Sequence, residues 1–326
     1  MSDSDIFDLS DCTLCPRACH ANRTAGQTGF CHVPARPFAG RAALLTCEEP
    51  CLTGRNGSGA VFFSGCNLGC IFCQNHEISR GSAGLLLDPA KLSNLFLSLQ
   101  EQGSATLNLV TASHYLPLIV PALEKARSHG LRIPVIYNTG AYEKKEAIRR
   151  LDGLIDVYLP DLKYCSDELA IAYSRAPRYF EYASAAIAEM VRQCPEPLFS
   201  NGARTLELEE ESAEDFEYPL MQKGVIVRHL ALPGAGEDSR RILSYLYKTY
   251  GDHIFISLMN QYTPMPAVAG HPRLHAALSD EDYEALCDYA VSLGISNGFF
   301  QEGGTVSESF IPAFDGSGLE AFSVHS

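Results

Sequence analysis

Short apolar runs recur along the chain, and segments with helical spacing of apolar residues separate them. The runs do not alternate strictly between apolar and polar residues, so we expect strands buried on both faces, as in a parallel sheet. Six such strands are predicted, at 60–64, 107–110, 133–137, 155–159, 225–232 and 254–258.

Helices are predicted between these strands. The first begins at Asp88, an N-cap residue, with Pro89 in its first turn, and stops at Gly103. Further helices are expected at 117–129, 143–151, 167–192, 239–249 and 280–293. Repeated strand–helix units with right-handed crossovers curl into a barrel, and six strands make an incomplete one. The pattern therefore predicts an α/β fold, a partial (β/α)6 TIM-like barrel with a cysteine-rich N-terminal extension.

Three regions are expected along the chain. Residues 1–58 form the cysteine-rich extension, 59–315 form the partial barrel, and 316–326 form a C-terminal tail. An acidic insertion near 195–222 interrupts the barrel. Its central run, 207–217, is too acidic to bury and is expected to be solvated.

Composition limits the classes of function. The chain has 326 residues and a formal net charge of −14, which opposes phosphate backbones and makes nucleic acid an unfavourable partner. No apolar stretch reaches the length of a membrane helix, and we expect no membrane partner. Twelve cysteines without an export signal indicate metal ligands in a reducing compartment, and we expect a cytoplasmic protein.

The strongest chemical signal is a C-x3-C-x2-C triplet directly after the first predicted strand. It consists of Cys66, Cys70 and Cys73. Thiolates are the usual ligands of iron–sulfur clusters, and three of them leave one iron of a four-iron cubane free to bind a reactant. In a barrel the triplet would lie on a loop at the carboxyl end of a strand, where reactive groups collect. The alternatives are a zinc site completed by His76, and inert buried thiols.

A second set of cysteines lies near the N-terminus. Cys12, Cys15, Cys19 and Cys31 have the spacing C-x2-C-x3-C-x11-C. Four thiols can close a site completely, so either a structural zinc or an auxiliary iron–sulfur cluster is expected there, with free thiols as the third alternative. A metal would fix a segment too small to be stabilised by burial alone.

The triplet, with the aromatic Phe72 beside its last cysteine, resembles the radical S-adenosylmethionine superfamily. Within that superfamily the chain is most similar to activating enzymes of glycyl-radical enzymes, and in particular to pyruvate formate-lyase activating enzyme-like proteins. The similar segments are IYNTGAY at 136–142, YLPDLKY at 158–164, VIVRHLALPG at 225–234, and the short motifs CPR at 15–17, EEP at 48–50, GSG at 57–59 and CQN at 73–75.

The resemblance implies a 4Fe-4S cluster on the triplet, with S-adenosylmethionine chelated to its open iron. Reduction by an electron donor such as flavodoxin or ferredoxin would release a 5'-deoxyadenosyl radical, which abstracts hydrogen from a substrate, here a protein or peptide. By position, the cofactor-binding residues would be Phe72, Ser113, Asn138, Lys163 and His229. The catalytic residues beyond these are not assigned.

One segment departs from the family pattern. Activating enzymes carry a Gly-Gly-Glu type motif after the second strand, whereas this chain has VTASHY at 110–115. Thr111 or Ser113 would supply a hydroxyl acceptor in place of the carboxylate. Two other functions stay open: radical modification of a small molecule or RNA, and a non-enzymatic, zinc-stabilised scaffold.

Overall fold

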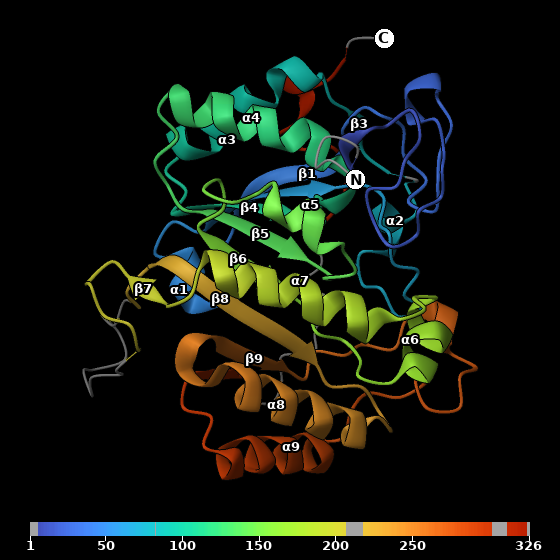
Figure 1. The fold of residues 1–326 in the computed structure, drawn as a ribbon, viewed down its shortest axis with the longest axis vertical. Helices are drawn as coiled ribbons and strands as arrows, with labels where there is room; N and C mark the ends of the chain where they lie inside the picture. The colour runs from blue at the N-terminus through green and yellow to red at the C-terminus, as the bar shows by residue number, and fades with distance from the viewer. Residues whose placement is uncertain (1–5, 82, 207–217, 302–311, 325–326) are drawn as a thin grey trace.

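A single mixed sheet organises the molecule in the computed structural model, which describes residues 6–81, 83–206, 218–301 and 312–324 (Figure 1). The acidic run 207–217 lies outside the described residues. The strands that pair in parallel are β2 (Ser58–Phe63), β4 (Thr106–Val110), β5 (Val135–Thr139), β6 (Val157–Pro160), β8 (Met221–Leu230), β9 (Phe255–Met259) and β10 (Gly298–Phe300).

The six expected strands are confirmed as β2, β4, β5, β6, β8 and β9, in that order across the sheet. The full order is β10-β9-β8-β6-β5-β4-β2-β1-β3, and no pairing joins the outermost strands of the described chain. The sheet is therefore open, as expected for a partial barrel. Strands β1 (Phe38–Leu45), β3 (Leu85–Leu86) and β7 (Leu198–Phe199) pair in antiparallel fashion and were not predicted.

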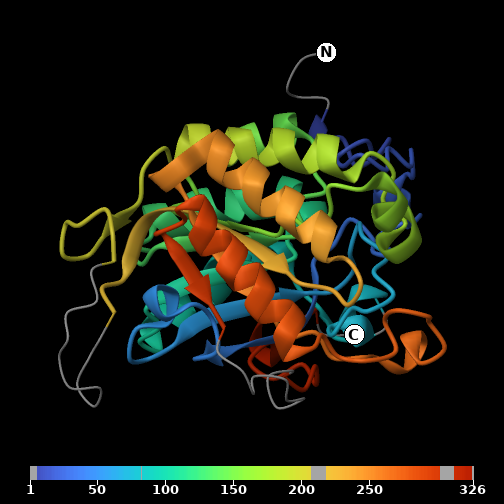
Figure 2. The same cartoon turned by 90° about the horizontal axis from the view of Figure 1, so that it is seen from below.

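Helices cover the outer face of the sheet, as the views in Figures 1 and 2 show. Their sequences explain their ends: in the last long helix the Ser279 side chain accepts a hydrogen bond from the backbone N–H of Asp282, and the left-handed Gly294 stops it. The longer helices are α3 (Leu92–Glu101), α4 (Leu116–Ser128), α6 (Asp167–Ser174), α7 (Tyr179–Gln193), α8 (Gly236–Tyr250) and α9 (Asp280–Leu293), and the short ones are α1 (Pro50–Thr53), α2 (His76–Ser79) and α5 (Lys145–Arg149).

One helix prediction was wrong. The expected single helix at 167–192 is two helices, α6 and α7, separated by a break at 175–178. Pro177 lacks the backbone N–H that a continuous helix needs, and Arg175 and Arg178 adopt left-handed backbone angles with φ of 50° and 56°.

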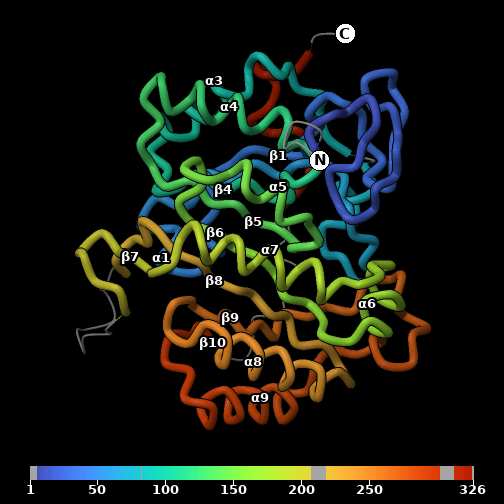
Figure 3. Tube along the Cα trace, in the orientation of Figure 1, coloured from blue at the N-terminus to red at the C-terminus, as the bar shows by residue number. Residues whose placement is uncertain are grey.

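The inner face of the sheet is closed at the amino ends of its strands. Helix α1 packs there, where Cys51 and Leu52 join a buried cluster with Ile136, Val157 and Ile226 from three strands. The opposite, carboxyl ends of the parallel strands carry the loops that hold the cysteine triplet. Figure 3 shows the N-terminal segment, in blue, beside these loops. The domain boundaries remain predictions, although β1, within the range 1–58, is part of the sheet.

No helix in the described ranges combines the length and apolar character required to cross a bilayer.

Candidate functional site

The cysteine triplet lies on the loop between β2 and α2, at the carboxyl edge of the parallel strands. All twelve cysteines of the chain lie in its described part, and all are free. The Sγ of Cys66 accepts a hydrogen bond from the backbone N–H of Leu68 at 3.3 Å, and the Sγ of Cys70 lies 2.9 Å from the Oγ of Ser174. The thiols of Cys66 and Cys70 are thus held in place by the protein.

Burial and repulsion between neighbouring thiolates raise the pKa of Cys66 and of Cys73. Burial and the neighbouring Cys70 raise the pKa of Cys73 to about 11, against the opposing effect of the Lys163 cation. The pKa of Cys66 is also raised, first by burial and then by the other two cysteines. A positive charge beside Cys66 and Cys73 would therefore stabilise their thiolates, and iron would supply it.

The donor set fits a cluster better than a zinc ion. His76, the expected fourth ligand of a zinc site, is exposed on α2. Three thiolates suit a four-iron cubane, in which each thiolate binds a different iron and one iron stays open. Cys66, Cys70 and Cys73 would hold such a cluster.

Gly65 gives the triplet loop its tight start. Its φ is +88°, in the left-handed region that favours glycine, and a Cβ there would lie 2.6 Å from the backbone oxygen of Cys31. The loop therefore begins in close contact with the N-terminal cysteine set.

Lys163 lies close enough to the triplet to interact electrostatically with Cys70. Its side chain is 17% exposed, and its Nζ lies 2.6 Å from the Oδ2 of Asp161 on the loop after β6. Burial alone would lower the pKa of Lys163, but Asp161 and Cys70 raise it above its ordinary value. The group is therefore a fixed cation, able to bind a carboxylate or a sugar hydroxyl.

Phe72 is also close to the triplet, by sequence and by contact. It is buried, and its ring packs edge-on against Tyr262 with the centroids 6.1 Å apart. Gln74 on the same loop donates a hydrogen bond to the backbone oxygen of Gln261 at 2.9 Å. The loop after β9 thus covers one side of the triplet loop.

Ser113 and Asn138 lie at the same edge of the sheet. Ser113 is buried in the turn after β4, and Asn138 is half-buried near the carboxyl end of β5. The backbone N–H of Thr111 donates to the backbone oxygen of Asn138 at 2.9 Å. Thr111 has a φ of 57°, which is strained for a β-branched residue, and such strain concentrates at functional sites.

His229 is enclosed by protein partners. Its Nδ1 lies 2.8 Å from the backbone oxygen of Leu162 and its Nε2 lies 2.9 Å from the Oγ of Ser239. Burial lowers its pKa to about 4, so the ring is neutral near pH 7. This is the geometry of a core histidine that holds the loop carrying Lys163, and direct cofactor contact stays a prediction.

A buried ion network lies inside the sheet, and sequence reasoning gave it no role. Arg228 on β8 binds both Glu48 and Glu49, with 2.8 Å between its Nε and the Oε1 of Glu49. Asn108 on β4 donates to Glu48 at 3.0 Å. Burial would raise the pKa of Glu49, but Arg228 lowers it below its usual value. In the sequence, the network was marked by the EEP motif at 48–50, one of the segments that resemble activating enzymes.

Arg17 connects the N-terminal segment to the triplet loop. Its Nε donates to the backbone oxygen of Asn67 at 2.9 Å, and its guanidinium lies 3.6 Å from the centre of the Phe30 ring. A second bond reaches the backbone oxygen of Arg175, in the break between α6 and α7. The CPR motif therefore has a structural role at the site.

The N-terminal cysteines surround a small cavity of their own. Its lining includes the four predicted ligands, Cys12, Cys15, Cys19 and Cys31. The structure thus brings together a set whose spacing predicted a common site.

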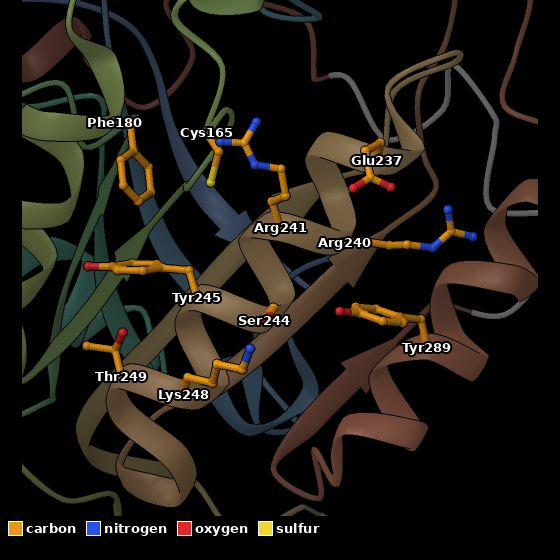
Figure 4. Close-up of a pocket in the computed structure, with 10 residues that line it drawn as sticks. All are labelled: Cys165, Phe180, Glu237, Arg240, Arg241, Ser244, Tyr245, Lys248, Thr249 and Tyr289. Atoms are coloured by element: carbon orange, nitrogen blue, oxygen red, sulfur yellow. The ribbon is translucent and has the colours of Figure 1, made fainter.

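A larger groove lies away from the triplet, along the outer surface of α8 (Figure 4). Its volume is about 660 Å³, and Arg240, Arg241 and Lys248 line it together with Tyr245 and Tyr289. None of the three triplet cysteines is in its lining. The groove concentrates positive charge on a chain whose formal net charge is −14.

Comparison with known proteins identifies the central segment. Residues 60–200 match the family model of the Radical SAM superfamily. The chain is also 24% identical over 290 residues to "Uncharacterized protein MJ0674" of Methanocaldococcus jannaschii, an alignment that covers 86% of this chain and 75% of that protein.

Several solved structures show a distant likeness. SuiB of Streptococcus suis bound to the precursor peptide SuiA has a TM-score of 0.46 and 13% identity, covering 73% of this chain and 46% of that chain. A domain of pyruvate-formate lyase-activating enzyme from Bacteroides vulgatus has a TM-score of 0.38 and 12% identity, covering 58% and 92%. The chain thus spans about half the length of SuiB.

Proposed function

Residues 60–200 belong to the radical SAM superfamily, and from this premise we propose that the protein reductively cleaves S-adenosylmethionine and uses the resulting radical to take hydrogen from a substrate. The observation that carries the proposal is the placement of Cys66, Cys70 and Cys73 on one loop at the carboxyl edge of the parallel strands, beside the fixed cation of Lys163.

The residues of the chain have separable tasks in this reaction. A 4Fe-4S cluster, when bound, supplies the electron that breaks the sulfonium bond of S-adenosylmethionine. Cys66, Cys70 and Cys73 bind that cluster. Lys163 attracts the cofactor's carboxylate or ribose, and Phe72 supplies an apolar surface for the adenine. Asn138 and the hydroxyl of Ser113 complete the polar contacts of the cofactor.

The substrate we propose is a protein or peptide, with a glycyl radical as one outcome of the reaction. Support comes from the segments at 136–142, 158–164 and 225–234, which resemble activating enzymes of glycyl-radical enzymes, and from an open sheet that leaves one side of the barrel unclosed. Small-molecule modification is the second candidate. RNA is disfavoured by the formal net charge of −14.

The reaction also needs a source of electrons, for which we propose a flavodoxin or a ferredoxin. Twelve free cysteines favour a reducing compartment such as the cytoplasm.

Anaerobic reconstitution tests the proposal. The full chain is loaded with iron and sulfide, reduced with dithionite and supplied with S-adenosylmethionine, and 5'-deoxyadenosine is measured by chromatography. We expect product from the native chain and none from Cys70→Ala. The exposed Cys47 provides a matched control, since Cys47→Ala should retain turnover. An iron-loaded native chain that forms no 5'-deoxyadenosine would refute the reaction, and a chain that takes up only zinc would favour the scaffold.

A further inference from the structure

The cavity of the N-terminal segment contains more than thiols. Besides Cys12, Cys15, Cys19 and Cys31, its lining includes Arg23 and His114. Cys12 and Cys31 are buried, and Cys15 is half-buried. The three sequence segments that meet here are thus an N-terminal loop, the turn at Cys31 and the turn after β4 that carries His114.

Arg23 is a buried cation that pairs with no carboxylate of the described residues. Its side chain is 1% exposed, and its guanidinium donates to the backbone oxygens of His114 at 2.7 Å and Pro34 at 2.8 Å. Its Nε has no hydrogen-bond partner among the described residues. A buried charge of this kind is costly unless an opposite charge lies nearby. Thiolates bound to a metal centre in the cavity would provide that negative charge.

His114 is the second buried group with an unused nitrogen. Its Nε2 lies 2.8 Å from the backbone oxygen of Ser64, so that nitrogen donates its proton outside the cavity. Its Nδ1 is buried and has no partner within the described chain. The cavity is thus lined by four cysteines and by two residues, Arg23 and His114, that each have a buried nitrogen without a hydrogen-bond partner in the described chain. Buried polar atoms are normally hydrogen-bonded, so a bound group is expected here.

The neighbourhood of the four thiols favours a redox-active occupant. The backbone oxygen of Cys31 lies against Gly65, at the start of the triplet loop, and His114 binds the carbonyl of Ser64 beside it. Thiolates are the usual ligands of iron–sulfur clusters, and four of them can hold a four-iron cubane. We propose that Cys12, Cys15, Cys19 and Cys31 bind a second iron–sulfur cluster, with Arg23 as its buried counter-charge.

The loops that carry the two cysteine sets touch each other. The backbone oxygen of Cys31 is so close to Gly65 that a Cβ there would approach it to 2.6 Å. His114 connects the two sites, because it lines the cavity while its Nε2 binds the carbonyl of Ser64 at the start of the triplet loop. A second cluster at this position would adjoin the triplet loop as an electron carrier. The existence of this cluster does not depend on the proposed reaction.

Metal analysis of a variant without the triplet tests the second site by itself. The triple variant C66A/C70A/C73A is reconstituted under anoxia with ferrous iron and sulfide, with zinc offered in parallel, and iron, zinc and sulfide are counted per chain. We expect about four iron atoms and about four sulfides to remain, against about eight of each in the native chain. One zinc per chain without sulfide, or no metal, would overturn the proposal.

Further variants in the triple background locate the surviving cluster. C12A/C15A should remove its iron and sulfide, whereas the control C47A should not. Iron retained by C12A/C15A would place the cluster elsewhere and refute the assignment.

Arg23→Met gives a readout that does not require loss of the cluster. Removing the buried cation should make reduction harder, so the midpoint potential of the surviving cluster shifts to a more negative value, because nearby charge and hydrogen bonds set that potential. An unchanged potential would refute the role of Arg23.

Discussion

Arg228→Met should be among the most destabilising single substitutions in this protein. Arg228 is the shared partner of Glu48 and Glu49, and all three side chains are at most 14% exposed. Removing the guanidinium leaves two carboxylates buried in the sheet without a cation. Breaking a buried pair in this way costs about 3–5 kcal/mol, a large part of a typical free energy of unfolding of about 5–15 kcal/mol.

The assay is urea unfolding of the metal-free chain, followed by circular dichroism at pH 7.5 and pH 5.5. Without Arg228 the carboxylates should take up protons in the folded state more readily than in the unfolded state, so the loss of stability should shrink as the pH falls. The variant R228M/E48Q/E49Q should recover much of the loss, because it buries no unpaired charge.

A surface ion pair is the matched control. Arg178 binds Glu181, and both side chains are about 60% exposed, so Arg178→Met should change stability little. If Arg228→Met cost no more than Arg178→Met, or if the loss did not depend on pH, the account of this network would be refuted.

Three other substitutions test separate parts of the structure. Burial raises the pKa of Glu143 to about 7 from 4.5, so its carboxyl stabilises the fold fully below about pH 4.5 and that contribution is lost as the pH rises through about 7. The free energy of unfolding of Glu143→Gln, measured relative to that of the native chain, should therefore rise by roughly 3 kcal/mol from pH 4.5 to pH 8. If urea unfolding gave the same pH dependence for both proteins, this prediction would be wrong. Lys163→Met should weaken S-adenosylmethionine binding to the iron-loaded chain by about tenfold or more in equilibrium dialysis, because it removes a charged hydrogen bond. The exposed Lys145→Met is its control, and equal affinities would exclude Lys163 from the cofactor site. Gly65→Ala should lower the thermal midpoint and the iron content more than Gly130→Ala. Both glycines have positive φ, but of the two only Gly65 has a backbone atom where the new Cβ would lie. Equal effects would show that backbone strain, and not the contact with Cys31, is the cause.

Much of the parallel sheet could be predicted because burial on both faces leaves a local trace. The six strands and most helices were expected from apolar runs and caps, and the triplet was placed at the end of the first of those strands. The short strand β10 was missed because its three residues, Gly298–Phe300, are too few to form a pattern. The break between α6 and α7 was marked by Pro177, yet the helical spacing on either side of it suggested one continuous helix.

The sequence by itself determined the chemistry that is available: three cysteines with the spacing of a cluster loop, four more near the N-terminus, and strands that place the first set at one edge of a sheet. Only the tertiary structure decided which distant groups meet. Arg228 lies 179 positions from Glu49, and Arg23 lies 91 positions from His114. Such pairs leave no periodic signal, because they form when separate segments fold against each other and bury charges and polar atoms that must then find partners.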